Sequence, residues 1–542
     1  MIYLLTFFTA LVVSMTTIPP MIRLAPRFGM IDNPDPRKVH TVPIPRVGGI
    51  GIVVGALIPL LLWVPLDEAM RAYLFGSLVL LAFGVWDDSR NLGPYLKFIG
   101  QIVAAVAVVY YGDVYIASLP FMGFNLLPVD IAKPFTVFAI VGMINALNVS
   151  DGLDGLAGGL SILSLICIAY LAFLADGFTV MSIVVAALGG VLGFLRYNTY
   201  PARVFMGDGG SQFLGFTLGF LAVVLTQKVN PALSVSLPLL FLGLPIVDML
   251  AVIVQRLHHG ISPFIATKHH IHHRLLELEF DHYEAVVIIY VTQCLLAASA
   301  IFLAYESDWL IFGIYLTVCA LLFTFLAVAE RSGWRAHSAT RVSRLANVVN
   351  AARKHKLITR LPTVFVITGV PVYFIFVSLG INRVPRDFSV GSALLAAVLF
   401  GYLLLGKRKD SFVLQAVNYA ASAFMVYLGT KFLAQANPAI ETAFIWYFGI
   451  LALAVALTVR YASDFQFSTT PMDYLVVFVV VFAGIMLNLL PEKTLLGVMA
   501  VEVVVLFYAC ELIVNRAKRL WSPQNIVTLG TLSVLGVKGF IG

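Results

Sequence analysis

The chain has 542 residues, of which 60% are hydrophobic and only 12% are charged. An ordinary soluble domain has about 25% charged residues, so the composition excludes a soluble enzyme, a disordered protein and a nucleic-acid-binding protein of the usual kind. Lysine and arginine number 35 against 28 aspartates and glutamates, which gives a net charge of +7. We therefore expect an all-α protein that crosses the lipid bilayer many times.

A helix that crosses a bilayer takes about 20 mostly apolar residues, and we expect about seventeen such segments, two or three of them short. Eleven are expected at residues 2–22, 48–64, 72–86, 98–111, 134–147, 159–175, 178–197, 212–227, 233–255, 284–304 and 308–329. Six more are expected at 362–380, 388–406, 411–433, 441–459, 472–490 and 493–514. We therefore predict a membrane domain over 1–330, a basic linker or interfacial helix over 331–361, and a second membrane module over 362–542.

The basic residues predict how these segments are oriented. When loops are assigned to alternating sides, about four-fifths of the 35 lysines and arginines, Lys538 included, fall on one side. Basic residues are enriched in cytoplasmic loops, so we expect the N-terminus outside and the C-terminus in the cytoplasm, in the inner (cytoplasmic) membrane of a cell. All ten histidines fall on the cytoplasmic side as well, which predicts a reaction at that membrane surface. A transporter or lipid flippase would instead place polar groups near the bilayer midplane.

The loop after the third segment contains Asp87, Asp88 and Lys97. Adjacent carboxylates repel each other, so such a pair commonly binds a cation or a proton. Lys97 offers a positive charge to a phosphate. A solvated helix end with a matching lysine is the plainer alternative.

The loop after the fifth segment contains Asn148, Asp151 and Asp154 among several glycines. Because it has acceptors and no lysine or arginine, it suits a metal ion or a nucleobase and ribose. A capped turn between two helices is the alternative. Further on, Phe205 precedes Asp208 in a glycine-flanked loop that opens a helix, where Asp208 is either a ligand or a helix cap, with Ser211 as another cap.

The loop after the ninth segment contains four histidines and two fixed cations between Lys268 and Arg274. Such a cluster can bind a transition metal or clamp a pyrophosphate, or it can simply be a basic interfacial segment. Together, the aspartates and histidines have what phosphoryl transfer to an anionic substrate requires, namely a metal site and donors that neutralise charge.

These motifs resemble the polyprenyl-phosphate N-acetylhexosamine-1-phosphate transferase family, in its WecA/TagO-like branch, which is related to the MraY enzymes. The resemblance covers roughly residues 1–325 and rests on five segments in the family's order, namely Arg37–Gly49, Asp87-Asp88, Asn145–Gly159, Val204–Asp208 and His269–Arg274. It implies an integral membrane enzyme that transfers a sugar-1-phosphate from a UDP-sugar to polyprenyl (undecaprenyl) phosphate and releases UMP. The product would start a lipid-linked cell-surface glycan, such as a cell-wall polymer or the O-antigen of lipopolysaccharide.

The resemblance also implies roles for individual residues. The expected catalytic residues are Asp87, Asp88, Asp151, Asp154 and Asp208, with Asp208 and Asp88 as ligands of Mg²⁺, for which Mn²⁺ could substitute. The expected substrate-binding residues are Lys38, Lys97, Asn148, Phe205, His269, His270, His272, His273 and Arg274. Within these sets, Asp87 resembles the carboxylate that orients the lipid phosphate, and Phe205 the aromatic ring stacked on uracil. We expect direct attack by the lipid phosphate, and a covalent intermediate formed first on an aspartate is the alternative.

The form of the histidine motif resembles the branch that uses UDP-N-acetylglucosamine, with other UDP-N-acetylhexosamines as alternatives. A homodimer is compatible with the resemblance, and a non-catalytic scaffold would be expected to have lost some of the motif carboxylates. In the second membrane module, Glu502 lies inside the last predicted segment and Glu511 nearer its end. A carboxylate within the membrane suggests a functional site, whereas pairing with Gln415 or Asn418 would give it a structural role.

Overall fold

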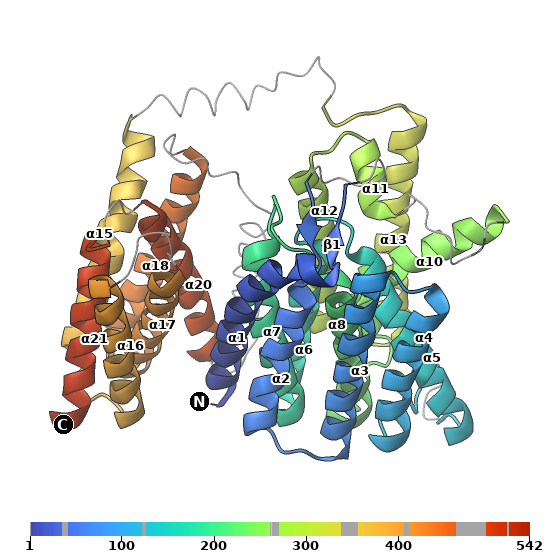
Figure 1. Ribbon diagram of the computed structural model, residues 1–542, viewed down its shortest axis with the longest axis horizontal. Coiled ribbons are helices and arrows are strands. Elements are labelled where there is room, and N and C mark those ends of the chain that lie inside the picture. Colours follow the sequence, from blue (N-terminus) through green and yellow to red (C-terminus); the bar gives the residue numbers. More distant parts are fainter. Residues whose placement is uncertain are drawn as a thin grey trace. The chain divides into compact units, whose positions relative to one another are not determined.

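The computed structural model describes residues 2–34, 42–121, 126–260, 262, 270–337, 356–405, 412–461, 495–516 and 520–541. This part of the chain is almost entirely helical (Figure 1), apart from one antiparallel pair of short strands, β1 (Ile31–Asp32) and β2 (Ile44–Pro45). Twelve helices in it are long and apolar enough to cross a membrane. The expected all-α protein with many membrane-spanning helices is confirmed, while the number seventeen stays a prediction.

The described residues form two compact units, one up to residue 337 and one from residue 356 onward. Unit 1 contains α1 (Ile2–Leu24), η1 (Ala25–Phe28), α2 (Gly48–Trp63), α3 (Glu68–Arg90), α4 (Pro94–Val106), η2 (Ala107–Tyr111), α5 (Val129–Ser150), α6 (Leu156–Leu174), α7 (Phe178–Asn198), α8 (Gly207–Val224), η3 (Leu225–Val229), α9 (Pro238–Phe241), α10 (Gly243–His258), α11 (Ile271–Glu277), α12 (His282–Phe302) and α13 (Asp308–Arg331).

Helix α8 forms the centre of unit 1, because every residue from Gly209 to Val224 is buried. It packs against α2, α3 and α5. Its contacts with α3 and α2 run through glycines: a Cβ added to Gly84 would lie 2.2 Å from the Gly209 Cα, and one added to Gly49 would lie 2.2 Å from the Gly210 nitrogen. Small residues allow membrane helices to approach at backbone distance, so these glycines set the position of α8.

The segment predicted to cross the membrane at 233–255 is not one continuous helix. Helix α9 ends at Phe241 and α10 begins at Gly243. The sequence Gly243-Leu-Pro245 lies at the break, and proline cannot donate the backbone hydrogen bond that a continuous helix needs. The Tyr315 hydroxyl donates to the Gly243 carbonyl at 2.9 Å, so α13 supports the chain where it breaks.

Unit 2 contains α15 (Lys356–Gly380), α16 (Arg386–Leu405), α17 (Phe412–Gly429), η4 (Thr430–Ala434), α18 (Pro438–Tyr461), α20 (Leu495–Arg516) and α21 (Pro523–Ile541). The predicted segment at 472–490 and most of the predicted linker, residues 338–355, lie outside the described residues.

Helix α21 lies beyond the last of the predicted membrane segments, which ends at residue 514, in a region where we expected Lys538 and the C-terminus on the cytoplasmic side. The Lys538 ammonium donates to the carbonyls of Ser378, Leu379 and Ile381 at 2.9, 3.0 and 2.7 Å, which satisfies groups that the end of α15 leaves free. Arg360 lies near the other end of α15, so Lys538 and Arg360 lie at opposite ends of that helix, while the side of the membrane on which the C-terminus lies stays a prediction.

Candidate active site

The predicted acidic and basic residues of the first loops gather at one end of the helices of unit 1. Asp87 and Asp88 lie in the last turn of α3, Lys97 in the first turn of α4, Asn148 in the last turn of α5, and Asp208 in the first turn of α8. Because chain direction alternates along the bundle, the ends of α3 and α5 meet the starts of α4 and α8. Segments that are 120 residues apart in sequence therefore share one site.

Three carboxylates form the centre of this site. One oxygen from each of Asp87, Asp88 and Asp208 lies within 4.8 Å of the other two. Lys97 contacts two of these residues, with its ammonium 2.7 Å from Asp87 Oδ2 and 2.8 Å from Asp208 Oδ2. Three carboxylates and one ammonium leave an excess of two negative charges, which matches a divalent cation. Hard oxygen ligands of this kind suit Mg²⁺.

Asp88 is held against the start of α8. Its Oδ1 accepts a hydrogen bond from the Asp208 backbone N–H at 3.1 Å, and its Oδ2 accepts a longer one from Gly209 at 3.5 Å. A carboxylate at this position satisfies free N–H groups of a helix start. Gly207 has φ +70°, and a Cβ there would lie 2.5 Å from Asp88 Oδ2. The cap of α8 is therefore Asp88, and neither Asp208 nor Ser211 has that role.

The Asp208 carboxylate is oriented on both of its oxygens. Its Oδ1 accepts from the Asn148 amide at 3.3 Å, and its Oδ2 accepts from the Gln212 amide at 3.1 Å and from Lys97. The Asp208 side chain is 21% exposed, against 5% for Asp87. Asp208 is therefore the member of the cluster that a ligand reaches most easily.

The loop between α5 and α6 lies between the acidic cluster and the histidines. Burial, together with the charges of Asp208 and Asp154, raises the pKa of Asp151 to about 7. The Asp151 carboxyl group therefore interacts electrostatically with the acidic cluster. Asp154 has local partners: its Oδ2 accepts from the Ala202 N–H at 2.8 Å, and its own N–H donates to His282 Nε2 at 3.1 Å. Within the described part of the chain, neither aspartate belongs to the close group of three.

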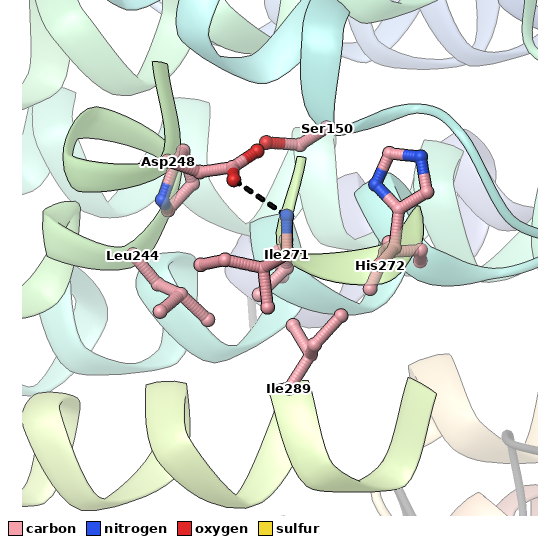
Figure 2. A pocket seen from close by; sticks show the side chains of 9 residues that line it. Ser150, Leu244, Asp248, Ile271, His272 and Ile289 are labelled. Atoms are coloured by element: carbon pink, nitrogen blue, oxygen red, sulfur yellow. Dashed lines mark hydrogen bonds between the residues drawn. The ribbon is translucent and has the colours of Figure 1, made fainter. Parts of the chain in front are cut away.

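Asp248 positions the start of the histidine helix α11. Its Oδ1 accepts from the Ile271 N–H at 2.8 Å, as Figure 2 shows, and its Oδ2 lies 3.0 Å from His270 Nδ1. A carboxylate on one ring nitrogen fixes the orientation and the tautomer of a histidine. Asp248 was not among the predicted site residues. Lys38 and His269 lie outside the described residues.

His272 is buried and packs on the loop that contains Asp151. A Cβ added to Gly152 would lie 2.3 Å from His272 Nε2. Burial lowers the pKa of His272 well below its usual value, and the neighbouring histidines add to this effect. His272 is therefore a neutral donor or acceptor at neutral pH. It also borders a cavity of about 20 Å³ beside Asp248 and Ser150 (Figure 2), which has room for about one water molecule.

Two further predicted residues have structural partners. Arg274 donates through Nε and Nη2 to both oxygens of Glu330, at 2.7 and 2.9 Å, and so connects α11 to α13. The backbone of Phe205 donates to the Pro45 carbonyl at 2.8 Å and accepts from Gly48 at 2.9 Å, which holds the entry to α8 beside α2. The polar site residues of the sequence motifs, His273 among them, could be recognised from the sequence. Gln212, Glu330 and Asp248 could not, and their roles follow from their contacts in the structure.

These features define a polytopic helical membrane protein whose acidic, lysine-bridged site lies at the helix ends. Residues 70–226 match the family described as glycosyl transferase family 4. A Bacillus subtilis protein named "Probable undecaprenyl-phosphate N-acetylglucosaminyl 1-phosphate transferase" is 34% identical over 330 residues, which are 60% of this chain and 91% of that protein. The chain therefore belongs to this family, and the resemblance seen in its sequence is confirmed.

Two further relatives agree with this result. The decaprenyl-phosphate N-acetylglucosaminephosphotransferase of Mycolicibacterium smegmatis is 32% identical and matches 57% of this chain and 84% of its own length. The undecaprenyl-phosphate alpha-N-acetylglucosaminyl 1-phosphate transferase of Haemophilus influenzae is 30% identical and matches 61% of this chain and 95% of its own length. About two-fifths of the present chain thus extends beyond what these relatives match.

Proposed function

We propose that this protein transfers N-acetylglucosamine-1-phosphate from UDP-N-acetylglucosamine to a polyprenyl phosphate and releases UMP. The observation that carries the proposal is the cluster of Asp87, Asp88 and Asp208 bridged by Lys97, in a chain that belongs to this transferase family. The lipid-linked product would start a cell-surface glycan. The active site would face the cytoplasm, where nucleotide sugars are made.

The reaction exchanges one phosphoanhydride for another. An oxygen of the lipid phosphate forms a bond to the phosphorus that carries the sugar, and the bond from that phosphorus to the UMP oxygen breaks. The two substrates are both anionic, so the protein's task is to bring them together and to neutralise the charge that develops.

The carboxylates fit a divalent cation because their oxygens are close together and their charge exceeds that of Lys97 by two. We infer that Asp208 and Asp88 would hold Mg²⁺, or Mn²⁺ in its place, with Asp87 beside them. When bound, the ion would supply positive charge to the diphosphate. Lys97 would contribute a second, fixed positive charge to the same phosphates.

The remaining residues would bind and orient the substrates. His270, oriented by Asp248, and the neutral His272 would offer hydrogen bonds to the diphosphate and sugar. The α5–α6 loop with Asp151 would approach the nucleotide through its glycines. Phe205 would stack on the uracil ring.

The decisive experiment measures UMP release by the purified full-length protein with polyprenyl phosphate, Mg²⁺ and a panel of UDP-sugars. We expect turnover with UDP-N-acetylglucosamine, its loss on chelation of the metal, and a loss of at least about 100-fold in Asp208→Asn. Asp113→Asn is the matched control, since Asp113 lies beyond the other end of α4, paired with Lys133.

Each outcome decides one part of the proposal. UMP release from no sugar at all would overturn the transferase activity. Turnover with another UDP-N-acetylhexosamine only would overturn the choice of sugar. Unchanged turnover in Asp208→Asn would overturn the proposed role of that residue.

A further inference from the structure

Unit 2 contains a row of buried polar side chains along one helix. On α17 and the π-helical turn η4 that follows it, Gln415, Asn418, Ser422 and Thr430 are all buried. Residues 415 and 430 are separated by about 22 Å along a helix axis, which is most of the thickness of a bilayer's hydrocarbon core. This row faces the inside of the bundle, where most membrane helices present apolar residues.

One end of the row is a network of amides and hydroxyls, in which Gln524 Oε1 has no hydrogen-bond partner among the described residues. The Asn418 carbonyl oxygen accepts from the Thr528 hydroxyl at 2.8 Å and from the Gln524 amide at 3.4 Å, and the Asn418 amide donates to Asn525 at 3.2 Å. Further along the row, the hydroxyl of Ser422 lies 3.4 Å from the Cys510 sulfur. Neutral groups that hydrogen-bond to one another in this way connect membrane helices, which gives this end of the row a structural role.

The other end differs, because it contains a carboxylate. Glu502 lies two turns into α20, is 3% exposed and accepts a hydrogen bond from the Thr430 hydroxyl at 2.9 Å. Among the described residues, no lysine, arginine or histidine forms an ion pair with it. An ionised carboxylate in an apolar interior with one neutral donor is very costly, whereas a protonated carboxyl group there is not.

The side chains described around Thr430 and the carboxyl group carry no fixed charge. Thr430 on η4 donates to the carboxyl group, Tyr373 on α15 lies against Gly429, the residue before Thr430, and Tyr447 on α18 stacks on Tyr373 at 5.4 Å between ring centroids. The Tyr447 hydroxyl is buried and has no hydrogen-bond partner among the described residues. Lys431, the nearest basic residue in sequence to Thr430, donates to the Tyr427 hydroxyl at 2.9 Å and is exposed.

Thr430 begins η4, a short π-helical stretch between α17 and the loop that precedes α18. Helices α4 and α8 of unit 1 end in such stretches as well, namely η2 and η3. At η4 the Thr430 hydroxyl meets the carboxyl group about two turns from the first residue of α20.

We propose that Glu502 and Thr430 form a proton-binding site in unit 2, which makes this unit a proton-binding membrane module with a chemistry separate from that of the transferase site. The carboxyl group is protonated in the folded protein near neutral pH, and it releases its proton toward the end of the bundle that contains η4. The ligand of the site is a proton. The balance is simple: Glu502–COOH becomes Glu502–COO⁻ and one proton enters the water.

The test labels the full-length protein in lipid nanodiscs with dicyclohexylcarbodiimide, an apolar reagent that converts a protonated carboxyl group into a stable N-acylurea. Peptide mass spectrometry at a series of pH values between 5 and 9 locates and quantifies the adduct. We expect at least ten-fold more adduct on Glu502 than on Glu441, an exposed-face carboxylate in the first turn of α18, at pH 7. The yield on Glu502 should decrease with pH around a midpoint at least two units above about 4.3, the ordinary value for glutamate.

Two variants show whether the site acts as a unit. Thr430→Val removes the hydroxyl that donates to the carboxylate, so the midpoint should move to higher pH. Thr442→Val is the control, since the Thr442 hydroxyl donates to the Pro438 carbonyl on the exposed side of α18, and it should leave the midpoint unchanged. Absence of adduct on Glu502 at every pH, or a yield that does not vary with pH, would overturn the proposal, and neither result depends on whether a variant folds.

Discussion

Lys97 contacts Asp87 and Asp208 with the same ammonium group, at 2.7 and 2.8 Å. Asp87 comes from α3 and Asp208 from α8, so one side chain of α4 joins the ends of two other helices. The ammonium cancels part of the repulsion among the three carboxylates and leaves the site negative enough to attract a cation.

Lys97→Met should therefore affect turnover and metal binding in opposite directions. Turnover should fall at least about 100-fold, because a charge that stabilises the transferred phosphate is lost. The apparent affinity for Mg²⁺ should rise, because three carboxylates then face the ion without a competing ammonium. UMP release at several Mg²⁺ concentrations gives both quantities. Lys133→Met, which removes an ion pair at the other end of α4, should change neither, and a Lys97→Met protein with more than a tenth of normal turnover would contradict the assignment.

Gly84→Ala should damage both the fold and the site. The added Cβ would lie 2.2 Å from the Gly209 Cα, so α3 and α8 would have to separate, at a cost of about 1–3 kcal/mol in the free energy of unfolding. Gly142→Ala is the matched control, because Gly142 also lies in a helix but has nothing within 4 Å of an added Cβ. It should leave thermal stability unchanged or raise it slightly. Equal unfolding midpoints for the two variants would show that the α3–α8 contact is not tight.

Asp248→Asn should reduce catalysis more than stability. It replaces the carboxylate that orients His270, and we expect a loss of about 10–100-fold in activity, the size seen when a metal-bound histidine loses such a partner. Asp308→Asn is the comparison, since Asp308 accepts from Ser234 and Ser236 at the opposite end of unit 1. Turnover per folded molecule, with the folded fraction taken from size-exclusion chromatography, should fall only in Asp248→Asn.

The segment after α13 should be more firmly held at low pH. His337 Nε2 lies 2.8 Å from Glu284 Oε2, and this hydrogen bond, together with the charge of Glu284, raises the pKa of His337 above its usual 6.5. A raised pKa means that the stabilising contact is complete below pH 6.5 and is lost as pH rises through the pKa of the folded state.

The measurement is amide hydrogen exchange of the peptide that contains Ala336, whose N–H donates to the Leu278 carbonyl. The protection of wild type relative to Glu284→Gln should be larger at pH 6 than at pH 8. A ratio that is the same at both values would rule out a titrating contact.

The sequence was sufficient to predict the helical membrane fold, because a long apolar segment has few stable structures other than a membrane-spanning helix. It failed at the 233–255 segment, where tertiary support from Tyr315 stabilises a break that hydropathy does not register. It also missed α21, because the polar residues of that helix are satisfied by partners far away in sequence, such as Asn418 for Thr528 and the end of α15 for Lys538. Pairings of this kind cannot be read from one segment alone.

The sequence motifs also indicated which residues belong to the site, but they did not indicate the structural role of each one. Asp87 and Asp88 are adjacent in sequence, yet one pairs with Lys97 and the other caps α8. Arg274 looked like a substrate ligand and is bound to Glu330, a residue with no motif around it. The glycines at positions 48, 49, 84, 209 and 210 were an available signal for the close helix contacts, since small residues at helix interfaces allow near approach.

The glycine contacts among α2, α3 and α8 have a practical consequence for redesign. Helices that touch backbone to backbone have no side chains left to vary at the contact, so the carboxylates they support are fixed in place as a rigid frame. Attempts to alter the choice of sugar should therefore leave these three helices intact and target α11, where histidine side chains form the surface.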